Sequence, residues 1–197
     1  MNLKLIIKNL IKLPSLCESF SMRNILEVLA LFENQKKVVR VPIKNHEWNI
    51  LNNFCKTNNL QICHSNFKIS IVRETSLGDI FTENVPWNSN SDKILGFVAY
   101  IATSKDVAQM AADMESRADS ENLGELYQYP NCCVENYSKK IERGDFWLDV
   151  LLSNSKGFIH SFYSNKLAYL FDDISIISDY FPCSLNCKET ILMGKKY

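Results

Sequence analysis

Two adjacent cysteines, Cys132 and Cys133, are the residues with the clearest capacity for chemistry in this sequence. They follow Pro130 and Asn131, so the segment predicts a loop that leads into the first turn of a helix. Pro130 suits the first helical position, or Asn131 can cap the helix. The N-terminal end of a helix is the positive end of its dipole, which favours thiolate over thiol. The segment therefore predicts a reactive or metal-ligating pair of sulfurs.

Nucleophilic catalysis is the first chemistry that this pair suggests. A thiol nucleophile needs a base, a group that orients the base and a donor for the oxyanion. His160, on a predicted strand over 157–163, is the candidate base, and Gln128 is the candidate oxyanion donor. The spacing from Gln128 favours Cys133 as nucleophile, with Cys132 as the alternative. The candidates for orienting the base are Asn165, Asp172 and Asp173.

In the order Gln, Cys, His and then Asn or Asp, residues 128–173 resemble the papain-like cysteine peptidase superfamily, which includes transacylases. The resemblance implies an α+β fold in which the cysteine-bearing helix packs on a small antiparallel sheet. It also implies acyl transfer or amide hydrolysis through a thioester, without a cofactor. The expected enzyme is an amide-forming transacylase, an amidotransferase or an amide hydrolase. Its substrate would be a small-molecule or peptidyl acyl group, which a carrier can present as a thioester.

Metal binding is the alternative chemistry. Cys183 and Cys187, together with Cys132 and Cys133, supply four thiolates, enough for zinc or an iron–sulfur cluster if the fold joins them. His160 could replace one of them. The segments 123–134 and 182–187 also resemble a prokaryotic family of unknown function. That resemblance implies that both cysteine pairs belong to one site, and it brings no established activity.

Composition limits the partners of the protein. Twenty-two Lys and Arg balance 22 Asp and Glu in 197 residues, so no basic excess points to nucleic acid or to an anionic membrane. Seven cysteines, an odd number, with no secretory signal ahead of them, predict free thiols in a cytoplasmic protein. A third class of function, a binding module with an aromatic-lined cleft, is also open.

Apolar periodicity and the residues that start or stop helices predict the secondary structure around these cysteines. We expect an α+β chain with a helical N-terminal region over 1–92 and a cysteine-containing region over 93–197, packed as one compact domain. His46 and His64 have no partner at ligand spacing and predict ordinary surface or turn residues. In the helix after Ser104, Val107, Met110, Ala111 and Met114 are expected to point inward. The expected helices span 3–13, 21–34, 45–57, a segment from 104, one from 131 to 144 and one from about 184; the expected strands span 38–41, 60–73 and 97–101, with a loop over 76–92.

Overall fold

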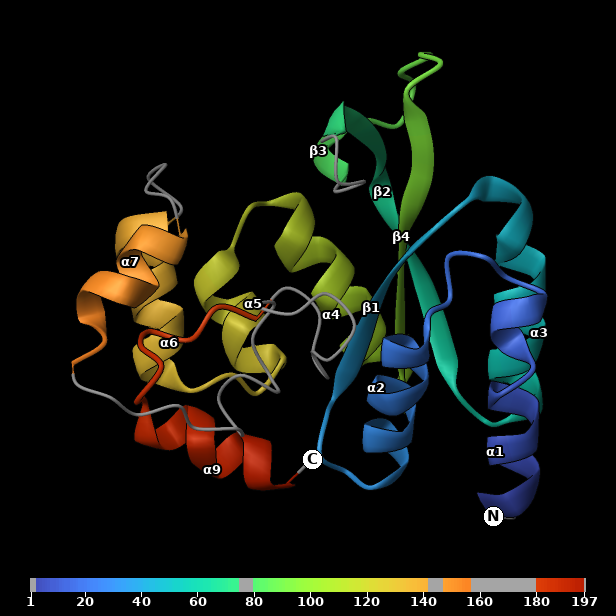
Figure 1. The fold of residues 1–197 in the computed structure, drawn as a ribbon. Coiled ribbons are helices and arrows are strands. Elements are labelled where there is room, and N and C mark those ends of the chain that lie inside the picture. The colour runs from blue at the N-terminus through green and yellow to red at the C-terminus, as the bar shows by residue number, and fades with distance from the viewer. Residues whose placement is uncertain (1–2, 75–79, 142–146, 157–179, 197) are drawn as a thin grey trace.

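A four-stranded antiparallel sheet with helices on both faces organises the protein (Figure 1). The computed structural model describes residues 3–74, 80–141, 147–156 and 180–196. The strand order is β1-β4-β2-β3. The strands are β1 (Val38–Ile43), β2 (Gln61–Glu74), β3 (Ile80–Pro86) and β4 (Ile94–Ala102).

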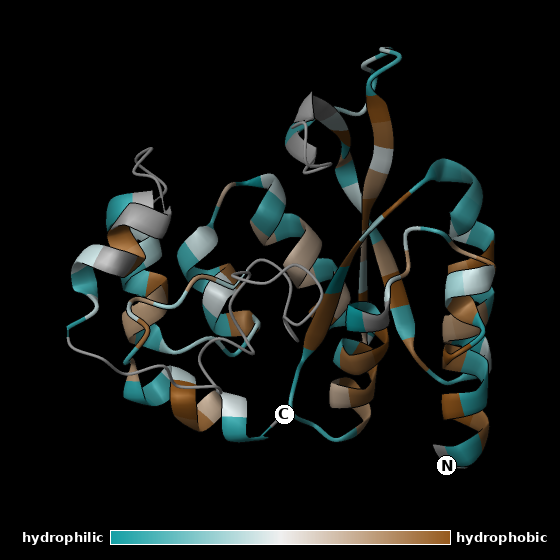
Figure 2. Ribbon diagram, in the orientation of Figure 1, coloured by the Kyte–Doolittle hydropathy of each residue, from teal (hydrophilic) through white to brown (hydrophobic). Residues whose placement is uncertain are grey.

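Strand β4 is the centre of the sheet, and both of its faces are buried. Its odd-numbered residues, such as Ala99 and Ile101, pack with the N-terminal helices. Its even-numbered residues, such as Val98 and Tyr100, pack with the helix that follows the strand. Because successive side chains of a strand point to opposite faces, a strand buried on both sides must be continuously apolar. Figure 2 shows this apolar strand in brown.

Three α-helices cover one face of the sheet: α1 (Leu3–Leu10), α2 (Met22–Phe32) and α3 (Trp48–Thr57). Short 3₁₀ turns, Leu13–Ser15 and Asn45–Glu47, follow α1 and precede α3. The three predicted N-terminal helices and the strands β1, β2 and β4 are therefore confirmed.

Helix α4 (Lys105–Ser116) covers the opposite face of the sheet, and α5 (Ser120–Leu126) packs against α4. The remaining elements lie beyond α5 (Figure 1): α6 (Asn131–Asn136), the π-helical turn η3 (Tyr137–Ile141), α7 (Trp147–Asn154) and α9 (Lys188–Lys196). The predicted α+β class is confirmed. The cysteine-bearing helix α6 packs against α5, whereas α4 packs on this face of the sheet.

Three local predictions were wrong. The predicted loop over 76–92 contains β3, an edge strand whose polar residues hid the strand pattern. Met110 is 45% exposed, on the solvent side of α4. The last helix begins at Lys188 instead of near residue 184, because the residues before it are hydrogen-bonded to the segment that follows α7.

Strand β4, which comes from the predicted 93–197 region, lies between β1 and β2, which come from the 1–92 region. The sheet thus spans both predicted regions. Among the described residues, no helix has the length and apolar character needed to cross a membrane.

A buried carboxylate, Glu47, ties the N-terminal helices to the end of β1. Its two oxygens accept hydrogen bonds from the backbone N–H of Ser19 at 3.0 Å and of Lys44 at 2.8 Å. The side chain is fully inaccessible to solvent. Burial by itself would raise the pKa of Glu47, but the hydrogen bonds from Ser19 and Lys44 outweigh it and lower the pKa below its ordinary value of 4.5.

We expect Glu47→Gln to lower the free energy of unfolding by about 1.5–3 kcal/mol at neutral pH, because an amide offers one acceptor to two backbone donors. A carboxylate with a lowered pKa stabilises the fold above its unfolded-state pKa and loses that contribution as the pH falls through its folded-state pKa. The difference between the native protein and the variant should therefore shrink below pH 4.5. Urea titrations at several pH values measure it.

Glu18→Gln is the matched control, because Glu18 is exposed and pairs with Lys44 at the surface. We expect it to change the free energy of unfolding far less than Glu47→Gln does, because solvent screens an exposed ion pair. Equal effects of the two variants would contradict the role given to Glu47.

Candidate metal centre

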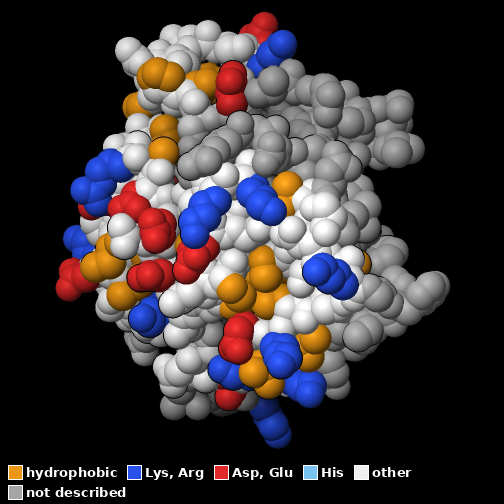
Figure 3. Space-filling model, turned by 90° about the vertical axis from the view of Figure 1, so that its left-hand side faces the viewer, with side chains coloured by type: hydrophobic (Ala, Val, Ile, Leu, Met, Phe, Trp, Pro, Cys, Tyr) orange, Lys and Arg blue, Asp and Glu red, His pale blue; other side chains and the backbone are white. Residues whose placement is uncertain are grey.

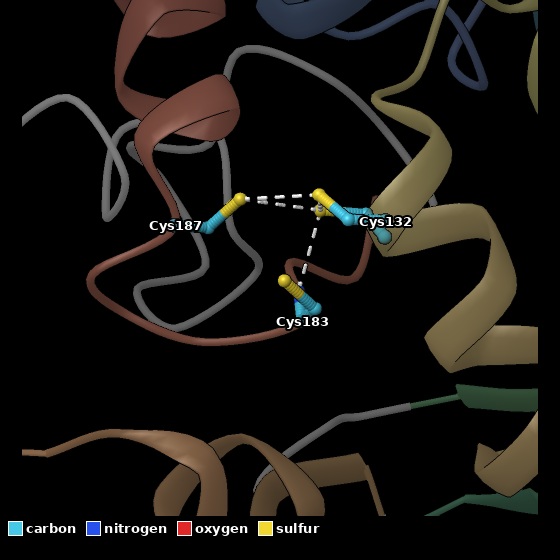
Figure 4. A group of neighbouring side chains, drawn as sticks. Cys132, Cys183 and Cys187 are labelled. Carbon is cyan, nitrogen blue, oxygen red and sulfur yellow. Dashed lines mark hydrogen bonds between the residues drawn. The ribbon is translucent and has the colours of Figure 1, made fainter.

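Four cysteine sulfurs from two distant segments meet at one point of the structure. The Sγ atoms of Cys132, Cys133, Cys183 and Cys187 all lie within 4.8 Å of one another. Cys187 Sγ is 3.6 Å from Cys132 Sγ and 3.8 Å from Cys133 Sγ, and the two adjacent cysteines are 3.9 Å apart at sulfur. Figure 4 shows the side chains from α6 and from the segment before α9 pointing toward one another.

The close packing of α5 on α6 places the first two sulfurs. A Cβ on Gly124 would lie 2.7 Å from a Val134 methyl group, so only glycine allows this approach. Gln128 then ends α5 with a positive φ of 62°, the left-handed conformation that commonly terminates helices. Pro130 caps α6, and its carbonyl accepts from the backbone N–H of Cys133 at 2.8 Å. The predicted capping is thus shifted by one residue: Pro130 precedes the helix, and Asn131 is its first residue.

The end of α7 places the other two sulfurs. The Asn154 amide donates to the Cys183 carbonyl at 2.9 Å, and the Ser155 hydroxyl accepts from the backbone N–H of Leu185 at 3.0 Å. Asn186 in turn donates to the Lys156 carbonyl at 2.7 Å. The turn that carries Cys183 is therefore hydrogen-bonded to the last residue of α7 and to the two residues after it. Cys187 lies immediately before α9.

Two hydroxyl groups surround the sulfur of Cys133. The Tyr180 hydroxyl donates to Cys133 Sγ at 3.3 Å, and the backbone N–H of Cys183 donates to the same atom at 3.4 Å. The Thr190 hydroxyl lies 3.4 Å from this sulfur and 2.7 Å from the Tyr180 hydroxyl. Tyr180 and Thr190 are both buried. These contacts are suited to holding negative charge on Cys133.

The four thiols are too close to ionise independently. Burial, followed by the neighbouring sulfurs of Cys133 and Cys187, raises the pKa of Cys132 to about 12. Hydrogen bonds to Cys133 and Cys187 raise the pKa of Cys183, whereas hydrogen bonds from Cys133 and Cys183 lower that of Cys187. The thiolate that we expected at Cys132 from its helix position is therefore disfavoured when no cation is present, because burial and the nearby sulfurs together outweigh the dipole of a short helix.

The spacing of the sulfurs matches one metal ion. Four sulfurs, each about 2.3 Å from a tetrahedral zinc ion, are about 3.8 Å apart. The distances of 3.6, 3.8 and 3.9 Å among the sulfurs of Cys132, Cys133 and Cys187 lie close to this value, and the sulfur of Cys183 lies within 4.8 Å of the other three. An iron–sulfur cluster places several atoms between its ligands and separates them further than a single ion does. A disulfide is also absent from this group, since a sulfur–sulfur bond is about 2.05 Å long.

The predicted catalytic residues are only partly placed. The candidate base His160 and the candidate orienting residues lie outside the described residues, and those orienting residues are Asn165, Asp172 and Asp173. Gln128 is exposed. His46 and His64 are exposed as well, and His64 stacks on Trp87 with ring centroids 5.3 Å apart.

Tyr180 and Thr190 were not predicted from the sequence. Each is three residues from a cysteine, Tyr180 before Cys183 and Thr190 after Cys187. A hydroxyl residue one helical turn from a candidate ligand is a weak signal by itself, because only the fold shows which sulfur it reaches. The other three cysteines, Cys17, Cys55 and Cys63, lie apart from this site in the two core clusters.

The face shown in Figure 3 mixes basic, acidic and apolar side chains. No charge of one sign dominates the described part of this face, in agreement with the equal numbers of basic and acidic residues in the sequence.

Comparison with known proteins bears on the same half of the chain. Residues 104–196 match a family described as "Protein of unknown function (DUF483)". No curated protein and no solved structure matches the chain. The matched region runs from the start of α4 to the end of α9 and contains all four clustered cysteines. It also contains both segments, 123–134 and 182–187, whose resemblance to a family of unknown function the sequence suggested, and that resemblance is thereby supported.

Proposed function

We propose that the protein is a zinc-binding protein in which Cys132, Cys133, Cys183 and Cys187 hold one ion. The observation that carries the proposal is the approach of all four sulfurs to within 4.8 Å of one another. A single divalent cation would balance the charge of thiolates that otherwise oppose each other's ionisation. Four sulfur ligands complete a tetrahedral shell, which is typical of structural zinc sites.

The ion would connect α6 to the segment that leads into α9. These two parts are 50 or more residues apart in sequence. Among the described residues they meet in the stacked rings of Tyr137 and Phe181 and in the small cluster around Cys133, Tyr180 and Cys187. Such a cluster is too small to hold two short helices by apolar burial alone. We therefore assign the ion a structural role, which is to fix the C-terminal helix on the rest of the fold.

Thiol-dependent acyl transfer in a papain-like fold stays a prediction, because its base and orienting residues lie outside the described residues. Two observations favour metal binding over this alternative. Cys133 is 2% exposed and its sulfur already accepts bonds from Tyr180 and Cys183, which suits a ligand better than a nucleophile. Cys183 and Cys187 also have no part in the acyl-transfer scheme, whereas the metal site uses both.

The first test is the metal content of the protein. We expect about one zinc per chain after expression with zinc in the medium, because the preformed site has four sulfur ligands. Cys133→Ser and Cys187→Ser should each weaken zinc binding by more than about 100-fold. This loss exceeds the usual effect of changing a residue that only hydrogen-bonds to a metal ligand. Elemental analysis and competition with a chromophoric chelator measure these values.

Cys63→Ala is the matched control, since Cys63 is also buried but packs in the core between the sheet and α4. It should keep full zinc content. Native protein that binds no metal, or binds it equally well without Cys133 and Cys187, would refute the proposal. Thiolates modified by a thioester substrate in metal-free protein would support acyl transfer instead.

The hydroxyl of Tyr180 should contribute to affinity through its bond to Cys133. We expect Tyr180→Phe to weaken zinc binding by about 10-fold or more, as removal of a hydrogen bond to a metal ligand usually does. Tyr100→Phe removes the same atom from another buried tyrosine, one that donates to Glu115 beside the sheet. That control should leave zinc affinity unchanged, and equal losses in the two variants would contradict the assignment. Chelator competition measures both.

Removal of the ion should loosen the C-terminal part of the protein before the sheet. We expect faster amide exchange in α6 and α9 after treatment with a strong chelator, whereas β4 keeps its protection because it lies inside two apolar clusters. Hydrogen-exchange mass spectrometry with and without zinc measures the difference. Unchanged exchange in α9 would argue against a structural role for the ion.

A further inference from the structure

The four sulfurs of the proposed zinc site differ in their access to solvent. Cys133 and Cys187 are 2% and 7% exposed, Cys183 is half-buried, and Cys132 is exposed. A small molecule that approaches from solvent therefore meets Cys132 first. This difference follows from the fold. Cys132 and Cys133 are neighbours in the first turn of α6, but Tyr180 and Thr190 pack around the sulfur of Cys133.

The hydrogen bonds add to this difference. Cys133 Sγ accepts from the Tyr180 hydroxyl and from the backbone of Cys183. Such bonds hold electron density on the sulfur and make it a weaker nucleophile. Among the described residues, the polar contacts of Cys132 Sγ are the sulfurs of Cys133 and Cys187. A thiolate bound to a metal also remains deprotonated.

We propose that Cys132 is a modification site, a metal-bound thiolate that reacts with small peroxides, and that Cys187 completes the reaction as a disulfide partner. The inference rests on the zinc site proposed above. Exposure, deprotonation by the metal and a sulfur free of hydrogen bonds from hydroxyls or amides are combined at Cys132 alone among the four ligands in the described structure.

The reaction has two steps. The Cys132 thiolate attacks one oxygen of hydrogen peroxide, the O–O bond breaks and hydroxide leaves, which gives a sulfenic acid. The Cys187 thiolate, whose sulfur is 3.6 Å away, then attacks the Cys132 sulfur and displaces a second hydroxide. Two thiolates lose two electrons in total, and one peroxide gains them. The ion loses two of its four ligands and is released.

Cys187 is a better partner than Cys133 for geometric reasons. Its sulfur is nearer to Cys132, at 3.6 Å compared with 3.9 Å. Adjacent residues have Cα atoms about 3.8 Å apart. Disulfides usually need about 4.4–6.8 Å between Cα atoms, so a bond between Cys132 and Cys133 would be strained.

The test uses full-length protein loaded with zinc, whose metal content is measured before any treatment. One equivalent of hydrogen peroxide should release about one zinc per chain to a chromophoric chelator, and peptide mapping should find the Cys132–Cys187 disulfide as the main product. A limiting pulse of iodoacetamide on the same zinc-loaded protein should label Cys132 at least about tenfold more than the other three ligands.

Two variants sharpen the test. Cys132→His keeps a zinc ligand but removes the thiolate, and we expect peroxide-dependent zinc release at least about tenfold slower than in the native protein. Cys63→Ala, outside the site, should release zinc at the native rate. If Cys132→His does not hold zinc, the mapping of the native protein still decides.

The outcomes separate the two proposals. Protein that contains no zinc before treatment would overturn the zinc site and this inference with it. Zinc-loaded protein in which Cys183 reacts first, in which Cys132 pairs with another cysteine, or which keeps its zinc under peroxide would overturn only the role of Cys132.

Discussion

The mutual repulsion of four crowded sulfurs is the constraint on which the C-terminal half of the structure depends. Thiols within 4.8 Å of one another cannot all ionise in a partly buried place unless a cation balances them. Burial, followed by the neighbouring sulfurs, raises the pKa of Cys132, and hydrogen bonds among the sulfurs raise the pKa of Cys183 and lower that of Cys187. The elements around the site, from the Gly124 contact to the bonds of Asn154, hold the sulfurs together against their repulsion.

The other half of the structure depends on a different interaction, the burial of β4 on both sides. Apolar residues of this strand supply one core with the N-terminal helices and a second core with α4. The site receives its support from this second core, because α4 holds α5 and α5 holds α6. The helix α6 that carries Cys132 and Cys133 is therefore connected to the sheet through α5 and α4.

The proposed chemistry follows from the unequal surroundings of equivalent ligands. The four proposed zinc ligands are chemically identical, but the protein gives each of them different surroundings. Tyr180, Thr190 and the backbone of Cys183 surround one sulfur, whereas Cys132 remains at the surface. The same arrangement that would stabilise a bound ion on its buried side leaves Cys132 open to reagents from solvent.

Most of the local structure could be predicted from the order of residues along the chain. Periodic apolar residues predicted the N-terminal helices, and the continuous run at 97–101 predicted the buried strand β4, because these patterns reflect burial on one face or on two. Sequence order also identified Cys132, Cys133, Cys183 and Cys187 as a candidate ligand set. The sequence pattern did not predict β3, because this polar edge strand has no apolar alternation. It also predicted that Met110 points inward, whereas this side chain lies on the exposed face of α4.

The geometric support for metal binding by the cysteines comes from long-range packing. Distances between Cys132 and Cys187, which are 55 residues apart, depend on every helix packed between them and cannot be derived from spacing along the chain. The contacts of Tyr180 and Thr190 with Cys133 also depend on packing. The position of a hydroxyl residue in the sequence does not show which sulfur it will contact. Local propensity is a property of neighbouring residues, whereas a metal site is a property of long-range packing.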